Sequence, residues 1–233
     1  LRRFPLEAGI APHFALLDER DADEMLLDAE EDLLAQARAE SDPDIAGALA
    51  DLTLQIRDSD RFTGLLANLA RARGRLSRLI DGAGGIAPLI QRVRGLLNVA
   101  AGDTRASIAA AASGDDVFDQ MGLRLALDAL AGGSKTDRER ARLIGDWLAA
   151  PERGLAEFEI YAGAYLTNAR FTGDIAIRKT LITKKAAEKS PGVEAILADE
   201  AGRIQACYRM MQAATVAACT EAILRVGEAL VAG

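Results

Sequence analysis

The chain has 233 residues, with 28 lysines and arginines against 35 aspartates and glutamates and a formal net charge of −7. Half of the residues are hydrophobic and only 4% are aromatic, a composition that favours close-packed helices over sheets. No apolar run reaches the roughly 18 residues of a membrane-spanning helix, and no signal-peptide pattern opens the sequence. We therefore expect no membrane-spanning helix in this chain.

Helical periodicity begins with a segment over 17–40, whose apolar face is opposed by a strongly acidic one. Further helices are predicted over 41–56, over 60–80, from Pro88 onward, and over 103–112, 115–131, 137–150 and 152–168. A less regular stretch, 169–189, follows, and Ser190 and Pro191 are predicted to cap a long final helix. No strand pattern or repeat is evident. We predict an all-α fold, an irregular multi-helix domain of about eight or nine helices that ends in one long helix and forms a single domain over residues 1–233.

Two cysteines lie in the predicted final helix, and they are 12 residues apart, at Cys207 and Cys219. That spacing separates them by about 18 Å along the helix, which is too far for a disulfide. Two free thiols suit a reducing cytoplasm.

Positive charge concentrates in two stretches of this acidic chain. Four of the five lysines lie within 178–190, and the stretch from Arg170 to Lys189 carries six positive residues against two acids. A second stretch, 57–94, has eight arginines against three aspartates. Such local reversals of charge predict a surface for a polyanion. The alternative is a solvated loop whose lysines keep it soluble or pair with the acidic helix over 18–44.

An acidic motif, DDVFD, spans 115–119 and matches the DDxxD that holds Mg²⁺-pyrophosphate in all-α prenyl-transferring enzymes. On a helix, carboxylates at i, i+1 and i+4 share a face and can hold a hard cation. The competing interpretation is a helix start, with Ser113 as N-cap and acids in the first turn. We favour the helix start, because no second acidic motif accompanies the first.

The remaining motifs predict structure rather than chemistry. AGGSKT at 131–136 lacks the Gly before Lys that a phosphate loop requires, and ILADEAG at 196–202 falls in a helical pattern rather than after a buried strand. The one histidine, His13, has no nucleophile motif to support a catalytic triad. Trp147 is predicted to anchor a helical core.

Two phrases resemble one protein family. Residues 1–26 are similar to the segment that follows the T-[IV]-H-x-F-C motif in helicase subunits of the AddA type, within the UvrD-like superfamily 1 helicases. The matching positions are Leu1, Arg2, Arg3, Pro5, Glu7, Ala8, Phe14, Leu17, Asp18 and Glu19. Residues 170–185 resemble the family's F-x-T-…-R-K-x-L-x-T-K-K phrase, most of all in its alphaproteobacterial branch. That match is carried by Arg178, Lys179, Leu181, Thr183, Lys184 and Lys185.

The resemblance implies the helical domain 1B, inserted into the first motor domain of an ATP-dependent helicase-nuclease of DNA double-strand-break repair. The sequence starts without methionine and stops within a helical pattern, so we expect a piece of such a protein. The family's Walker A loop, DEx-box, arginine finger and nuclease carboxylates are missing. We therefore expect no catalysis and no cofactor from this chain, while the parent would use ATP and Mg²⁺.

The implied partners are the DNA backbone, duplex or single-stranded, the parent motor domains and a partner nuclease subunit, with no membrane. The candidate DNA-contacting residues are Arg178, Lys179, Lys184, Lys185 and Lys189, followed by Arg71, Arg73, Arg75 and Arg78. One alternative is a protein-interaction scaffold without DNA contact. A further alternative is an Mg²⁺-dependent prenyl-transfer enzyme that uses Asp115, Asp116 and Asp119.

Overall fold

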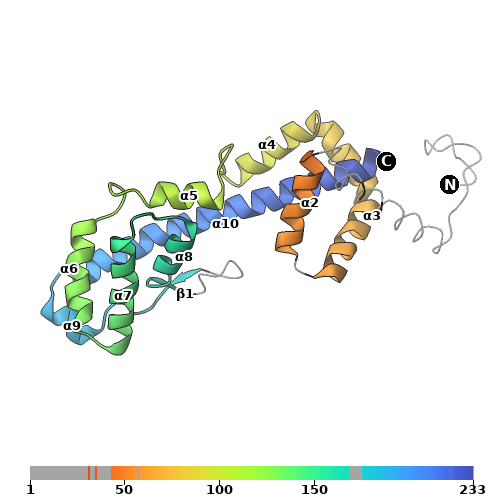
Figure 1. Ribbon diagram of the computed structural model, residues 1–233. Coiled ribbons are helices and arrows are strands. Elements are labelled where there is room, and N and C mark those ends of the chain that lie inside the picture. Colours follow the sequence, from red (N-terminus) through yellow and green to blue (C-terminus); the bar gives the residue numbers. More distant parts are fainter. Residues whose placement is uncertain (1–30, 32–34, 36–42, 57, 168–174, 233) are drawn as a thin grey trace, which may run out of the picture. The chain divides into compact units, whose positions relative to one another are not determined.

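The computed structural model describes residues 43–56, 58–167 and 175–232, together with Glu31 and Ala35. These residues form nine α-helices and one pair of two-residue strands (Figure 1), so the predicted all-α fold with a long final helix is confirmed. His13 and almost all of the predicted helix over 17–40 lie outside the described residues. The chain divides into two compact units, which are taken in turn. The single domain expected over residues 1–233 stays a prediction.

Unit 1 comprises the residues up to Ile90 and those from Cys219 onward. Its elements are α2 (Pro43–Gln55), α3 (Ser59–Ala83), the start of α4 (Ile86–Leu96) and the end of α10 (Val193–Ala232). Asp58 begins α3 by accepting hydrogen bonds from the backbone N–H groups of Asp60 and Arg61, and Gly84 ends it in the left-handed conformation at φ 85°. The helix predicted over 60–80 is therefore confirmed. It could be predicted because the residues that begin and end it, Asp58 and Gly84, adjoin it in the sequence.

The core of unit 1 is aliphatic. Its buried members are Ile45, Ala48, Leu49, Leu52, Leu66, Ala222 and Val226. Close approach of α10 to α3 depends on Gly227, since a Cβ there would lie 2.3 Å from Cδ2 of Leu76. A side chain at this position would therefore require Leu76 to move.

Unit 2 spans Gln91–Ala218. Its elements are α5 (Arg105–Ala112), α6 (Gln120–Ala131), α7 (Lys135–Ala149), α8 (Leu155–Ala162), β1 (Leu166–Thr167), β2 (Ala176–Ile177), α9 (Lys184–Lys189) and the first part of α10. Figure 1 shows α6, α7 and α8 side by side along that part of α10. Three buried tyrosines, Phe158 and Trp147 fill the core between them. Trp147 stacks on Tyr161 with 4.6 Å between ring centroids, so its predicted role as a core anchor is confirmed.

Two helix starts in unit 2 follow local capping rules, and one prediction is wrong. Thr104 and Ser134 form capping boxes that begin α5 and α7. The helix predicted over 115–131 begins instead at Gln120, where Asp119 accepts the Gly122 N–H. Ser113 is not an N-cap, because its Oγ donates to the carbonyl of Ala109 at the end of α5.

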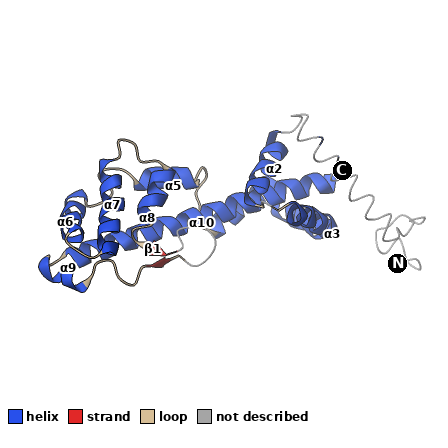
Figure 2. Cartoon of the chain, turned by 60° about the horizontal axis from the view of Figure 1, so that its bottom comes forward, coloured by secondary structure: helices blue, strands red, loops and turns tan. Residues whose placement is uncertain are grey.

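The stretch between α8 and α10 also departs from the prediction. Leu166 pairs with Ile177 and Thr167 with Ala176 in a short antiparallel sheet, which ends α8 well before the predicted residue 168 (Figure 2). The described part of the stretch expected to be irregular holds the helix α9. Ser190 ends α9 and does not cap α10, which begins at Val193 after Gly192 at φ 89°.

The helices of the described segments include none that combines the length and the apolar character needed to cross a membrane.

Candidate nucleic-acid interface

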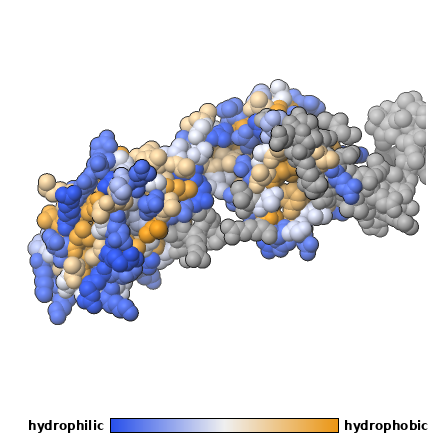
Figure 3. Space-filling model, viewed as in Figure 1, coloured by the Kyte–Doolittle hydropathy of each residue, from blue (hydrophilic) through white to orange (hydrophobic). Residues whose placement is uncertain are grey.

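The four clustered lysines project from one short segment of unit 2. Residues 178–189, called the lysine segment below, run from the end of β2 through α9. Lys179, Lys184, Lys185 and Lys189 are all exposed, and none of them forms a hydrogen bond or an ion pair with the described residues. On α9, Ala186 is 5% exposed and anchors the helix to the core, so the lysines point to solvent. Figure 3 shows a largely hydrophilic surface on the part of unit 2 that carries α9.

The arginines of unit 2 behave differently from these lysines. Several of them are held by carboxylates: Arg105 by Glu159, Arg142 by Glu139 and Asp146, Arg153 by Asp115, and Arg203 by Glu200. An arginine that is already paired with a carboxylate attracts a further anion only weakly, because the two charges largely cancel. The lysine segment therefore concentrates cations that form no ion pair with the described residues of unit 2.

A buried aspartate fixes the lysine segment to α7. Asp137 is 0% exposed. Its Oδ1 accepts the backbone N–H of Thr183 at 3.1 Å, and its Oδ2 accepts the Thr183 hydroxyl at 2.6 Å and the Ser134 N–H at 2.9 Å. Burial raises the pKa of Asp137, but the hydrogen bonds from Thr183 and Ser134 outweigh it and hold that pKa below its ordinary value. Because Thr183 immediately precedes Lys184, this carboxylate sets where α9 begins.

Two arginines fasten the other parts of the segment. Arg140 donates from Nε to the carbonyl of Ala164 at 3.2 Å and from Nη1 to that of Leu181 at 3.1 Å. Burial lowers the pKa of Arg140, and the nearby Arg178 lowers it further. Arg178 is half-buried and donates from Nε to the carbonyl of Gly163 at 3.1 Å. The structure thus ties Arg178 to α8, and its predicted contact with DNA stays a prediction.

The second predicted group lies on α3 in unit 1. Arg71, Arg73, Arg75 and Arg78 are all exposed, and none forms an ion pair with the described residues. At about 100° per residue, Arg71, Arg75 and Arg78 fall within an arc of about 60°, while Arg73 lies on the other side of the helix. The helix therefore presents three of the four guanidinium groups on one face.

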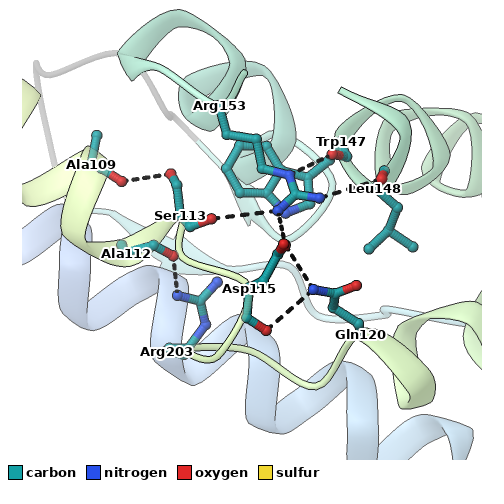
Figure 4. Close-up of polar contacts among 9 residues, drawn as sticks. All are labelled: Ala109, Ala112, Ser113, Asp115, Gln120, Trp147, Leu148, Arg153 and Arg203. Carbon is teal, nitrogen blue, oxygen red and sulfur yellow. Dashed lines mark hydrogen bonds and ion pairs between the residues drawn. The ribbon is translucent and has the colours of Figure 1, made fainter. Parts of the chain in front are cut away.

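The DDVFD motif has a structural role in this fold. Asp115 precedes α6 and pairs with Arg153, and it also accepts a hydrogen bond from Gln120 (Figure 4). The guanidinium of Arg153 lies 5.4 Å from the Trp147 ring centroid and donates to the Trp147 carbonyl at 3.0 Å. The helix face that would hold Mg²⁺ is not formed, since Asp115 and Asp116 lie outside α6. Within the described ranges, no group of three or more His, Cys, Asp or Glu side chains could hold a metal ion.

The other motif residues are also structural. Ser134 of AGGSKT caps α7. Glu200 of ILADEAG lies within α10, where it accepts the Tyr161 hydroxyl at 2.7 Å and pairs with Arg203. Burial raises the pKa of Tyr161 well above its ordinary value, and Tyr165 and Glu200 raise it further. These groups form a satisfied polar network inside the core of unit 2 rather than a reactive site.

Asp137 and Arg140, which position the lysine segment, were not predicted from the sequence, and Thr183 was named there only for the family resemblance. The S-x-x-D spacing of Ser134 and Asp137 could have indicated a capping box. No local pattern indicates the bond to Thr183, which lies 46 residues further along the chain.

Comparisons with models of protein families, with curated proteins and with solved structures found no match to this chain. The function is therefore argued from the site and from the resemblance of the two phrases.

Proposed function

We propose that this chain binds the backbone of DNA through the lysine segment. The observation that carries the proposal is the group of four exposed lysines, none of which is paired with a described carboxylate. Asp137 and Arg140 hold the segment that bears them against α7. A fixed group of ammonium ions attracts a polyanion and releases its condensed counterions. Lysine contacts with phosphate give affinity and orientation without reading the sequence.

The resemblance of the two phrases supports a wider proposal. We propose that the chain is the helical 1B domain of an AddA-type helicase-nuclease subunit, which engages DNA for a motor located elsewhere in the parent protein. ATP and Mg²⁺ would act in that parent, which would work in double-strand-break repair with a partner nuclease subunit in the cytoplasm. The free thiols of Cys207 and Cys219 are consistent with a reducing compartment.

A titration of labelled DNA tests the proposal. Fluorescence anisotropy of a duplex and of a single strand, each at several salt concentrations, should show binding that weakens steeply with salt. Lys184→Ala combined with Lys185→Ala should weaken binding and flatten the salt dependence. Arg209→Ala is the matched control for loss of a positive charge, since Arg209 is an exposed residue of α10 outside the lysine segment. A control variant as weak as the lysine variant would refute the assignment of the site.

A protein-interaction scaffold is the second candidate, and a specific observation favours it. Met121 is 77% exposed and Leu125 is 58% exposed, and their spacing of four residues puts them on one face of α6. Exposed apolar pairs of this kind suit a protein partner more than a phosphate backbone. Absence of DNA binding at low salt, with a stable complex that Met121→Ser and Leu125→Ser disrupt, would favour the scaffold.

A further inference from the structure

Two arginines of unit 2 meet at the C-terminal end of α8. Arg178 donates from Nε to the carbonyl of Gly163 at 3.1 Å, and Arg140 donates from Nε to the carbonyl of the next residue, Ala164, at 3.2 Å. Gly163 still has helical dihedral angles, φ −60° and ψ −19°. Because neighbouring carbonyls of a helical turn point the same way along the axis, the two guanidinium groups lie side by side.

This arginine pair carries more positive charge than the described residues around it balance. A guanidinium stays protonated in a protein, so the pair holds two positive charges. Asp137 is the described carboxylate that pairs with Arg140, with 3.7 Å between Oδ1 and Nη1, and no described carboxylate pairs with Arg178. Burial lowers the pKa of Arg140, Arg178 lowers it further, and Asp137 opposes both effects. Two positive charges therefore face one negative charge, whose oxygens already accept hydrogen bonds from Thr183 and Ser134.

Most of the N–H donors of the pair are not used within the described part of the chain. Arg178 donates only from Nε, and Arg140 donates from Nε and Nη1. Arg140 is 9% exposed and Arg178 is half-buried, so an anion beside them would be screened less than at an open surface. Each guanidinium is a planar fork that fits two oxygens of an anion. One carboxylate can fill one fork, whereas the tetrahedral oxygens of a phosphate group can meet two adjoining forks.

We infer that Arg140 and Arg178 form an oxyanion site that binds a phosphate group, which is either a backbone phosphate of DNA or inorganic phosphate. The remaining donors of both guanidinium groups are its ligands. The inference goes beyond the proposed function, which depends on the exposed lysines, because inorganic phosphate could fill this site without DNA.

Equilibrium dialysis of the full 233-residue chain against radiolabelled inorganic phosphate tests the site, at an ionic strength held constant with sodium chloride. We expect saturable binding at one site per chain. Arg178→Gln should weaken this binding about tenfold, the loss expected for hydrogen bonds from a charged group. Glutamine keeps an N–H donor at the position of Nε, so the bond to Gly163 can remain and the urea midpoint in chloride should change little.

Two matched variants control for a general loss of positive charge. Arg209→Gln removes an exposed arginine of α10, and Lys184→Ala with Lys185→Ala removes two lysines of the lysine segment. Both variants should keep the phosphate affinity of the unsubstituted chain. Equal phosphate affinity of Arg178→Gln and the unsubstituted chain would refute the site, and so would an equal loss in Arg209→Gln.

A second measurement needs no substitution. In the NMR spectrum of the unsubstituted chain, the Nε–H signals of Arg140 and Arg178 should shift saturably as phosphate is added. The signal of Arg142 should not shift, because Glu139 and Asp146 already hold that guanidinium. Absence of a saturable shift at Arg140 and Arg178 would overturn the inference.

The anisotropy titration with duplex DNA then identifies the source of the phosphate. If a backbone phosphate fills the site, Arg178→Gln weakens duplex binding, and inorganic phosphate displaces the duplex at constant ionic strength. If inorganic phosphate is the ligand, neither change alters duplex affinity. Absence of salt-dependent duplex binding would refute the proposed function, while saturable phosphate binding that Arg178→Gln weakens would still establish the oxyanion site.

Discussion

Asp137→Asn is the substitution that most directly perturbs the attachment of the lysine segment. The carboxylate accepts three hydrogen bonds, two from Thr183 and one from the Ser134 backbone, in a site that is 0% exposed. Asparagine presents an NH₂ group in place of one oxygen. In one orientation that group faces the Ser134 N–H, and in the other it faces the Thr183 N–H. Either way, the backbone N–H of Ser134 or of Thr183 loses its acceptor.

The structure allows an estimate of the cost. A hydrogen bond to a charged group contributes about 1.5–3 kcal/mol, and a partly buried donor left without an acceptor adds part of the desolvation penalty of a buried one. We therefore expect the free energy of unfolding of unit 2 to fall by about 2–4 kcal/mol. Such a loss would be a large fraction of the stability of a typical domain.

Urea unfolding followed by tryptophan fluorescence is the appropriate assay, because the chain's one tryptophan, Trp147, is 2% exposed in the core of unit 2. Thr180→Val is the matched control. Thr180 is exposed on the same segment and forms no hydrogen bond with a described residue. We expect the loss of its hydroxyl group to change the free energy of unfolding by less than about 0.5 kcal/mol. Equal free energies of unfolding for Asp137→Asn and the unsubstituted chain would refute the role given to this carboxylate.

The remaining predictions concern pH, the core and α3. The pKa of Asp137 lies below its ordinary value of 3.8. The ionised carboxylate therefore stabilises the fold fully above pH 3.8, and this stabilisation is lost as the pH falls through the lowered pKa. The Asp137→Asn variant should lack this acid-dependent loss of stability when unfolding is followed by Trp147 fluorescence. Arg153→Ala should lower the free energy of unfolding by about 1–3 kcal/mol, because it removes one donor from Asp115 and one from each of two backbone carbonyls of α7. An unchanged urea midpoint would contradict the packing in Figure 4. Joint substitution of Arg71, Arg75 and Arg78 by alanine should weaken duplex binding in the anisotropy titration more than Arg73→Ala does, and equal affinities would remove that face of α3 from the DNA surface.

Much of the fold follows from signals that act over a few residues. Asp58 and Gly84 mark the limits of α3, and Pro88 falls in the first turn of α4 as its missing N–H requires. No proline interrupts the final segment, which forms a helix of 40 residues. These features depend on backbone preferences and capping, which neighbouring residues determine.

The predictions from sequence are wrong where a residue far along the chain determines the local structure. Ser113 and Asp119 are both good N-caps by composition. Ser113 instead bonds back to Ala109, and Asp115 is drawn to Arg153, which lies 38 residues further along the chain. The attachment of Thr183 to Asp137 likewise spans 46 residues. The sequence therefore reveals the cluster of lysines, whereas the hydrogen bonds that attach the lysine segment to α7 can be seen only in the structure.

The salt dependence of duplex binding tests the central proposal most directly. Each lost phosphate contact should make the slope of log K against log salt less steep by about 0.9. We expect Lys184→Ala with Lys185→Ala to reduce the slope by about 1.8, and Arg209→Ala to leave it unchanged. The same slope for the unsubstituted chain and the double lysine variant would refute backbone binding by the lysine segment.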